Sequence, residues 1–294
     1  MTDATGGILL TDRLVELAER DSERELVIDP VYGRLTYGTV AEQVERLAAG
    51  LRHLDIGPGD RVILQLPNWA PFLVFHLALT KIGAVTAAIP IVYREHELRN
   101  VLRLTGANTV VLPSAYRDHD YAAMAESVRE GWNDPLRIIL VGDGDDTARP
   151  DTLSYESLMK QPWEARSTNS SVPEPDLDDL TALGFTAGTT GSLKAAMYST
   201  RVLSATNACL QDRFGLNEGD RIFGCSPIGH AVGFTHALRM VLTIGGSIVL
   251  FFVFFLCDFL RIDTHRNNTN DRIYRENPGL YSGFFFVSWK CFQG

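Results

Sequence analysis

The sequence predicts an α/β fold of stacked strand–helix units, and three observations support this. Apolar runs of strand length, such as Val62–Leu66 and Leu136–Val141, recur along the first half of the chain. Segments with apolar residues at helical spacing separate these runs. Breaker clusters such as Gly57-Pro58-Gly59-Asp60 stand between the two kinds of segment. Strands that alternate with helices in this way are typical of a parallel sheet with helices on its faces.

The first elements follow this order. Residues 9–20 are apolar at positions 10, 14, 15 and 17 among charged residues, which predicts a short amphipathic helix. Strands are expected over 26–29 and 35–37, on either side of a turn, and a helix over 40–51. The strand 62–66, the apolar helix 72–81 and the apolar run 83–89 then form a strand–helix–strand unit. His76 lies on this helix with no second ligand spaced to match it, so we expect a core or boundary histidine.

The middle of the chain continues the pattern with a helix over 95–104, a strand over 109–112, a helix over 121–129 and a strand over 136–141. Residues 143–178 are polar and rich in Asp, Ser and Pro, and predict a surface connection with one short amphipathic patch. That patch comprises Tyr155, Leu158 and Met159. The acidic residues Asp176, Asp178 and Asp179 are interpreted as a solvated turn, and no metal site is expected.

A loop of small and hydroxylic residues follows the apolar strand Leu180–Phe185. Its residues are Thr186, Ala187, Gly188, Thr189, Thr190 and Gly191, followed by Ser192, Leu193 and Lys194. Glycines let backbone N–H groups approach phosphate oxygens, threonine hydroxyls add neutral donors, and a lysine supplies positive charge. The loop therefore suits a phosphate group, although the same residues also suit an ordinary Gly/Thr turn between a strand and a helix. It is not a Walker A loop, because Lys194 stands three residues after Gly191.

The spacing resembles the signature loop Thr-Ser-Gly-Thr-Thr-Gly-x-Pro-Lys-Gly of the adenylate-forming superfamily, the AMP-dependent acyl- and aryl-CoA synthetases. The chain departs from that pattern at Ala187, Leu193 and Ala195. A second resemblance lies in Pro227–Gly233, which is similar to the Pro-x-x-His-x-x-Gly segment of the same superfamily. Residues 35–37, 57–62 and 79–84 are similar to other segments of its first subdomain.

The resemblance implies an incomplete N-terminal domain of this superfamily and ATP-dependent activation of a carboxylic acid, with a thioester to CoA usually following. It implies ATP, Mg²⁺ and CoA as reactants or cofactors, with magnesium arriving on the nucleotide. Thr186–Gly191 and Lys194 are the expected nucleotide-binding residues, and Lys194 and His230 the catalytic candidates. His230 and Gly233 are expected near the acid. The acid, and whether CoA or a carrier protein accepts the acyl group, stay open.

The composition indicates which classes of partner and which cellular compartment to expect for this protein. The net charge of −9 argues against nucleic acid, since binding a phosphate backbone needs a basic face. The four cysteines are scattered without CxxC spacing, and the first twenty residues hold acidic side chains and no long apolar core. We therefore expect a cytoplasmic protein whose cysteines form no disulfide framework and no zinc site. The oligomeric state stays open.

The end of the chain differs from the rest. Nine of the fifteen phenylalanines lie within residues 251–294. We therefore expect a family domain over 10–250 and an atypical tail over 251–294, for which a changed reading frame or a mispredicted exon is our hypothesis. Residues 240–257 carry no charge, and they predict either a membrane-spanning helix or a glycine turn into a core strand of the same sheet. The strand interpretation is favoured. A non-catalytic fragment, associated with membranes through 240–257, is the alternative to an active ligase.

Overall fold

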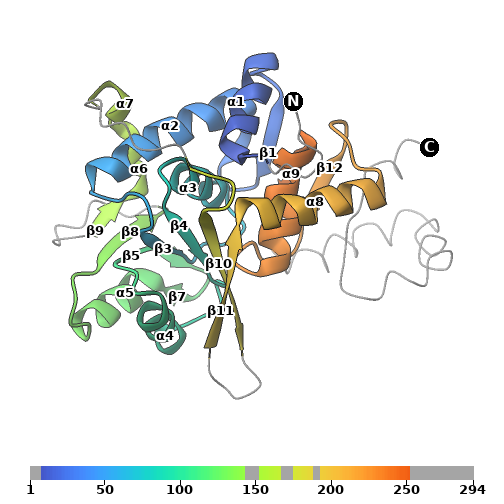
Figure 1. Ribbon diagram of the computed structural model, residues 1–294. Helices are drawn as coiled ribbons and strands as arrows, with labels where there is room; N and C mark the ends of the chain where they lie inside the picture. Colours follow the sequence, from blue (N-terminus) through green and yellow to red (C-terminus); the bar gives the residue numbers. More distant parts are fainter. Residues whose placement is uncertain (1–7, 143–151, 167–174, 188–192, 252–294) are drawn as a thin grey trace, which may run out of the picture.

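The computed structural model describes residues 8–142, 152–166, 175–187 and 193–251 (Figure 1). The larger of its sheets contains β3 (Arg61–Leu64), β4 (Val85–Ala88), β5 (Thr109–Pro113), β8 (Arg137–Val141), β9 (Thr152–Ser154), β10 (Leu180–Ala187) and β11 (Leu193–Ser199). These seven strands lie in the order β11-β10-β4-β3-β5-β8-β9. Every neighbouring pair is parallel except β10 with β11. The predicted α/β class with a parallel sheet is confirmed.

A smaller sheet contains β1 (Glu25–Asp29), β2 (Gly33–Thr36), β12 (Arg221–Gly224) and β13 (Ser247–Leu250), in the order β12-β13-β1-β2. Strands β6 (Ala115–Tyr116) and β7 (His119–Asp120) form a separate short hairpin. The helices are α1 (Leu10–Arg20), α2 (Tyr37–His53), α3 (Ala70–Lys81), α4 (Glu95–Thr105), α5 (Tyr121–Glu130), α6 (Tyr155–Lys160), α7 (Trp163–Arg166), α8 (Thr200–Phe214), the π-helix η1 (Gly233–Arg239) and α9 (Met240–Ile244).

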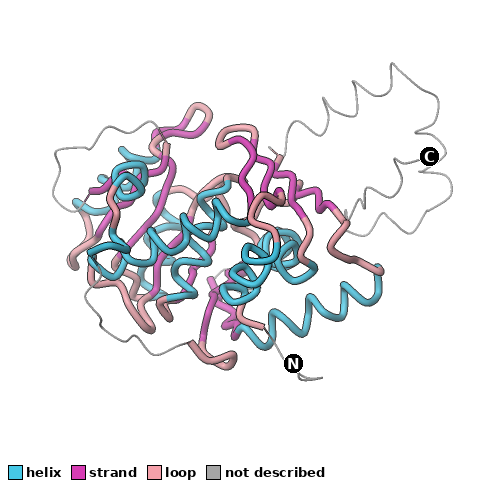
Figure 2. The backbone as a smooth tube through the Cα atoms, turned by 90° about the horizontal axis from the view of Figure 1, so that it is seen from above, coloured by secondary structure: helices cyan, strands magenta, loops and turns pink. Residues whose placement is uncertain are grey.

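Helices cover both faces of the larger sheet (Figure 2). Successive side chains of a strand point to opposite faces, and β3 shows this directly. Val62 and Leu64 join the core that contains α2 and α3, whereas Ile63 joins the core that contains α4 and α5. Helix α3 has no polar face and is buried from Ala70 to Thr80, as its apolar sequence predicts. The larger sheet is therefore the middle layer, with one hydrophobic core on each side.

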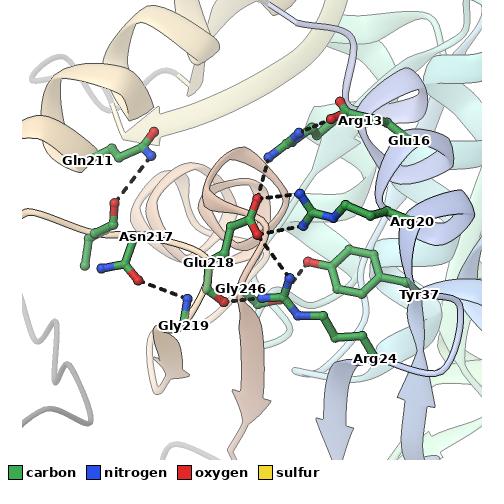
Figure 3. Close-up of polar contacts among 11 residues, drawn as sticks. Arg13, Glu16, Arg20, Arg24, Tyr37, Gln211, Asn217, Glu218, Gly219 and Gly246 are labelled. Atoms are coloured by element: carbon green, nitrogen blue, oxygen red, sulfur yellow. Dashed lines mark hydrogen bonds and ion pairs between the residues drawn. The ribbon is translucent and has the colours of Figure 1, made fainter.

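The carboxylate of Glu218, which precedes the smaller sheet's strand β12, binds arginine side chains of α1 (Figure 3). Glu218, in the turn before β12, accepts two hydrogen bonds from Arg20 at 3.0 and 2.6 Å. Arg13 and Arg24 each lie 3.5 Å from the same carboxylate. Beside them the buried Tyr37 hydroxyl donates to the Gly246 carbonyl oxygen at 2.7 Å, and burial raises the pKa of Tyr37 to about 12. These contacts join the start of the chain to β12 and β13.

Two expected connections contain strands that sequence analysis did not predict. Residues 143–178 were expected to form a surface connection, but β9 pairs in parallel with β8 and extends the larger sheet. Tyr155 and Leu158, which follow β9 on α6, are buried. Lys194 was expected in a loop, and instead it lies on β11, which pairs along its whole length with β10. The candidate phosphate loop therefore connects two antiparallel strands, not a strand and a helix.

Residues 244–250 form the predicted turn and strand, but not in the predicted sheet. Strand β13 pairs in parallel with both β1 and β12 of the smaller sheet, so the expectation of a strand in the larger sheet is wrong. Residues 240–250 comprise α9 and β13, and no helix within the described ranges is both long and apolar enough to cross a membrane. The tail from 252 onward lies outside the described residues.

Candidate active site

The first half of the candidate site is the β10–β11 hairpin. Thr186 and Ala187 end β10, and Leu193 and Lys194 begin β11. Thr186 pairs directly with Lys194 across the antiparallel ladder, so both side chains lie on one face of the hairpin. The predicted phosphate-binding residues Gly188, Thr189, Thr190 and Gly191 connect the two strands and lie outside the described residues.

Two polar side chains at this end of the hairpin are available to a ligand. Thr186 and Lys194 are exposed, and Lys194 forms no ion pair or hydrogen bond with the described part of the chain. An ammonium group without a protein partner can bind an anion without first breaking another ion pair. The hydroxyl and ammonium groups, facing the same way, therefore fit a phosphate group.

Strand β4 links this hairpin to the second motif. It pairs in parallel with β10, and Ala88 at its carboxyl end lies beside Gly184. Because parallel strands point the same way, the residues that follow β4 and β10 lie at one edge of the larger sheet. In open α/β sheets the carboxyl edge is where ligands bind. Ile89 and Pro90, which continue β4, therefore stand next to the hairpin end.

The second motif, Pro227–Gly233, packs directly against these two residues. A Cβ atom on Gly229 would lie 2.1 Å from the Ile89 carbonyl oxygen, so only glycine allows the backbones to approach this closely. A Cβ atom on Gly233 would lie 2.3 Å from the Pro227 carbonyl oxygen, so the segment also turns tightly on itself. Both predicted motifs therefore reach the same edge of the sheet, although more than thirty residues separate Lys194 from His230 along the chain.

His230 is held through its backbone, and its ring is exposed. Its N–H donates to the Pro227 carbonyl oxygen at 3.0 Å, and its own carbonyl oxygen accepts from Phe234 N–H at 2.9 Å. The ring contacts its own segment through Nδ1, which lies 3.4 Å from the Val232 nitrogen, a long and weak contact. Nε2 has no hydrogen-bond partner among the described residues. The ring is therefore open to a ligand at this edge.

A π-helix begins three residues after His230. η1 spans Gly233–Arg239, and Gly233, Phe234 and Leu238 are buried within it. π-Helical turns are rare and occur disproportionately at functional sites, because the wider turn displaces side chains from their regular positions. The sequence did not predict this π-helix. Over so short a stretch, the spacing of apolar residues does not distinguish the i→i+5 hydrogen bonds of a π-helix from the i→i+4 hydrogen bonds of an α-helix.

Two buried side chains behind this helix were not predicted as a pair. Arg239 is 1% exposed, and its Nη1 donates to His76 Nε2 at 2.7 Å. Because arginine can only donate, the His76 proton lies on Nδ1, which donates to Thr86 Oγ1 at 2.9 Å. Burial lowers the pKa of Arg239 to about 9, and burial together with the Arg239 charge lowers the pKa of His76 well below its ordinary value. The expectation of a core histidine at position 76 is confirmed.

No group of three or more His, Cys, Asp or Glu side chains able to hold a metal occurs in the described part of the chain. The fit for a nucleotide comes from the donor set instead. Lys194 and Thr186, which pair across the hairpin, carry an ammonium and a hydroxyl group, both of which are donors of the kind that phosphate oxygens accept. A magnesium ion is held largely by such phosphates and by water.

Comparisons with known proteins show the family to which the chain belongs. A family model described as AMP-binding enzyme matches residues 14–262, which includes both motifs. The medium-chain fatty-acid–CoA ligase of Escherichia coli is 28% identical over 249 residues, covering 85% of this chain and 43% of the ligase. The salicyl-AMP ligase/salicyl-S-ArCP synthetase of Mycobacterium tuberculosis is 32% identical, covering 64% of this chain and 32% of that protein. The chain thus spans less than half the length of these relatives.

Solved structures show the same fold. The apo structure of Mycobacterium smegmatis MbtA is 27% identical with a TM-score of 0.70, covering 88% of this chain and 47% of that one. Acetoacetyl-CoA synthetase from Streptomyces lividans aligns with a TM-score of 0.71 at 23% identity, covering 83% of this chain and 38% of that one, and shows the fold alone. Because the family model covers most of the sequence, the chain belongs to the AMP-binding enzyme family.

Proposed function

We propose that this domain binds ATP and takes part in activating a carboxylic acid as its acyl-adenylate. The carboxylate oxygen attacks the α-phosphorus of ATP, the bond to the β-phosphate breaks, and pyrophosphate leaves. In a second step a thiol attacks the carbonyl carbon and AMP leaves. Among the relatives are a CoA ligase and a synthetase that loads a carrier protein, so CoA is the proposed acceptor and a carrier protein the alternative.

The observation that supports this proposal is the meeting of two motifs at the carboxyl edge of β4 and β10. We propose that Thr186 and Ala187 at the end of β10, the connecting residues Gly188–Gly191 and Lys194 hold the β- and γ-phosphates, where fixed donors and one cation stabilise the departing pyrophosphate. His230 and Gly233 are proposed to border the acid, since their segment lies beside the hairpin end. Holding both reactants at one edge would supply the orientation that the attack needs. We propose a cytoplasmic location, where free thiols such as Cys209 and Cys225 persist.

The first test is ATP binding by calorimetry. We expect the 294-residue chain to bind Mg-ATP, and Lys194→Ala to weaken that binding by about one to two orders of magnitude, the value of one charge-assisted contact. Lys81→Ala is the matched control, because Lys81 pairs with Glu45 at the opposite edge of the sheet. Equal affinities for wild type and Lys194→Ala would remove Lys194 from the nucleotide site.

The second test is pyrophosphate release with octanoate, benzoate and salicylate in turn. Release that depends on one of these acids supports acid activation. ATP binding without release for any acid supports the alternative, a nucleotide-binding member of the family that does not complete the reaction. Absence of ATP binding contradicts both.

A further inference from the structure

We propose that Asn68 is a positioning residue that holds the Pro227–Gly233 segment, and with it His230, against the carboxyl edge of the larger sheet. The backbone part of this inference stands on the structure alone. The consequence for ligand binding rests on the proposed function, because it assumes that His230 borders the acid. Asn68 itself lies in the connection between β3 and α3 and is 7% exposed.

The side-chain amide of Asn68 lies within hydrogen-bond distance of four backbone groups from two separate parts of the chain, and its two N–H groups are shared among three carbonyl oxygens. Its Nδ2 donates to the carbonyl oxygens of Gly224 and Ser226, each at 2.9 Å, and of Phe251 at 3.2 Å. Its Oδ1 accepts from Ile228 N–H at 2.9 Å. These groups follow β12 and β13, so one buried side chain fixes the exits of two strands.

The surroundings dictate an amide at this position. Three carbonyl oxygens surround one terminal atom, which must therefore be the donating nitrogen, and an N–H faces the other, which must accept. Aspartate has the same shape but would set a carboxylate oxygen against three carbonyl oxygens. Alanine would leave all four backbone groups without this partner, and buried polar groups without partners are costly.

The same connection also holds the third parallel strand of the smaller sheet. Asp29, at the end of β1, accepts from Ala70 N–H at 2.5 Å, two residues beyond Asn68. It also accepts from Val31 and Tyr32 N–H at 2.7 and 3.1 Å. Residues 68–70 therefore cap the carboxyl ends of β1, β12 and β13 together. This connection, which follows β3 of the larger sheet, therefore links the larger sheet to the smaller one.

The position of His230 depends on residues 68–70 through a short stretch of backbone. Ile228, which donates to Asn68, precedes Gly229, the residue that touches the Ile89 carbonyl oxygen, and His230 comes next. The segment is thus held on one side by Asn68 and on the other by the residue that follows β4. The hydrogen bonds of the Asn68 side chain within the described residues all go to backbone groups, so it positions His230 and takes no chemical part.

Asn68→Asp provides a readout that a general loss of stability would not give. Burial and the three carbonyl oxygens would raise the pKa of the introduced carboxyl, and nearby Asp29 adds like charge. When protonated, that carboxyl can again donate one hydrogen bond and accept one. The defect of Asn68→Asp should therefore fade as pH falls from 8 to 5.5, whereas the defect of Asn68→Ala should not. Each variant is compared with wild type at the same pH.

The experiment combines two measurements on the full chain. Calorimetry gives the affinities for Mg-ATP and for the octanoyl and salicyl sulfamoyl-adenosines, which mimic acyl-adenylates. Hydrogen exchange compares a peptide covering 226–234 with one covering β5. Asn100→Asp is the control, because among the described residues the Asn100 side chain forms hydrogen bonds only with His96 and Arg103 of its own helix.

For Asn68→Asp at pH 8 we expect faster exchange confined to 226–234, adenylate-mimic binding weakened about tenfold, and ATP binding changed less than twofold. Recovery of both defects at pH 5.5 completes the expected result. Unchanged mimic binding, or equal loss of mimic and ATP binding, overturns the positioning role. If wild type binds neither ligand, the proposed function fails. Exchange then decides the inference alone, and protection of 226–234 retained in Asn68→Asp overturns it.

Discussion

Arg239 is a buried cation that no carboxylate balances among the described residues. Its guanidinium donates to a neutral imidazole, and its Nε has no hydrogen-bond partner in the described part of the chain. Removing a guanidinium from water costs several kcal/mol, and a single bond to His76 returns only part of that. Arg239 therefore lowers stability where it stands. It also fixes one position of η1 relative to α3 and β4, through His76 and Thr86.

Replacing Arg239 by methionine tests this interpretation. Methionine fills similar space without charge, and the loss leaves no buried ion behind because His76 is neutral. We expect Arg239→Met to raise the free energy of unfolding by about 1 to 3 kcal/mol, measured by urea denaturation at pH 7.5. Arg239→Lys keeps a buried cation but loses the planar set of guanidinium donors, so its free energy of unfolding should be lower than that of wild type. A methionine variant less stable than wild type would show that the guanidinium is better compensated than its described contacts indicate.

At the scale of single residues, sequence reasoning pointed to candidates inside short motifs and not to residues whose partners are distant in the chain. Thr186, Lys194, His230 and Gly233 stand in short motifs whose residues are near one another in the chain, and the structure brings the two motifs to one edge. Asn68 and Arg239 act through partners more than 150 residues away in sequence. A short-range pattern carries no information about such pairs.

At the scale of elements, long periodic segments were predicted well and edge strands were not. Helices α1, α2, α4 and α5 begin and end within a few residues of their predicted bounds. Strand β9 has three residues, too few to show alternation, and it follows a polar stretch. Strand β11 is an edge strand with exposed positions at Lys194 and Met197, so it lacks the apolar run by which buried strands are predicted.

The contact between α1 and the turn before β12 makes stability depend on pH. Its centre is Glu218, whose pKa is held below the ordinary value of 4.5, chiefly by the hydrogen bonds from Arg20. A lowered carboxyl pKa means that the stabilisation is complete above about pH 4.5 and is lost as pH falls through the folded pKa.

Glu218→Gln should therefore lower the free energy of unfolding at pH 7 by about 1 kcal/mol, a small value because the pair is partly exposed and screened. The difference from wild type should shrink as pH falls below 4.5. Glu16→Gln, which removes a contact to Arg13 alone, should have a smaller effect. Denaturation curves from pH 3.5 to 7 measure both. A Glu218→Gln deficit that stays constant across this range would contradict the lowered pKa.

At the scale of the whole molecule, the two sheets explain why the class of fold was predictable and the arrangement was not. Alternating strands and helices indicate a parallel sheet, and the larger sheet has that form. The sequence does not show that β1 and β13, more than 200 residues apart, pair in a second sheet. The spacing of apolar residues indicates which positions of a strand are buried. It does not indicate which sheet the strand joins, because strands of either sheet have buried positions. The boundary expected near residue 250 stays a prediction, and the family match continues to 262.

The central claim is that the β10–β11 hairpin and the Pro227–Gly233 segment form one ligand site. Amide chemical shifts of the isotope-labelled chain, followed while an acyl sulfamoyl-adenosine is added, test it most directly. We predict that the amides of Thr186, Lys194, His230 and Gly233 shift together along one binding curve, while those of β12 and α1 stay unchanged. Shifts confined to one motif, or two motifs that titrate with different affinities, would contradict the single site.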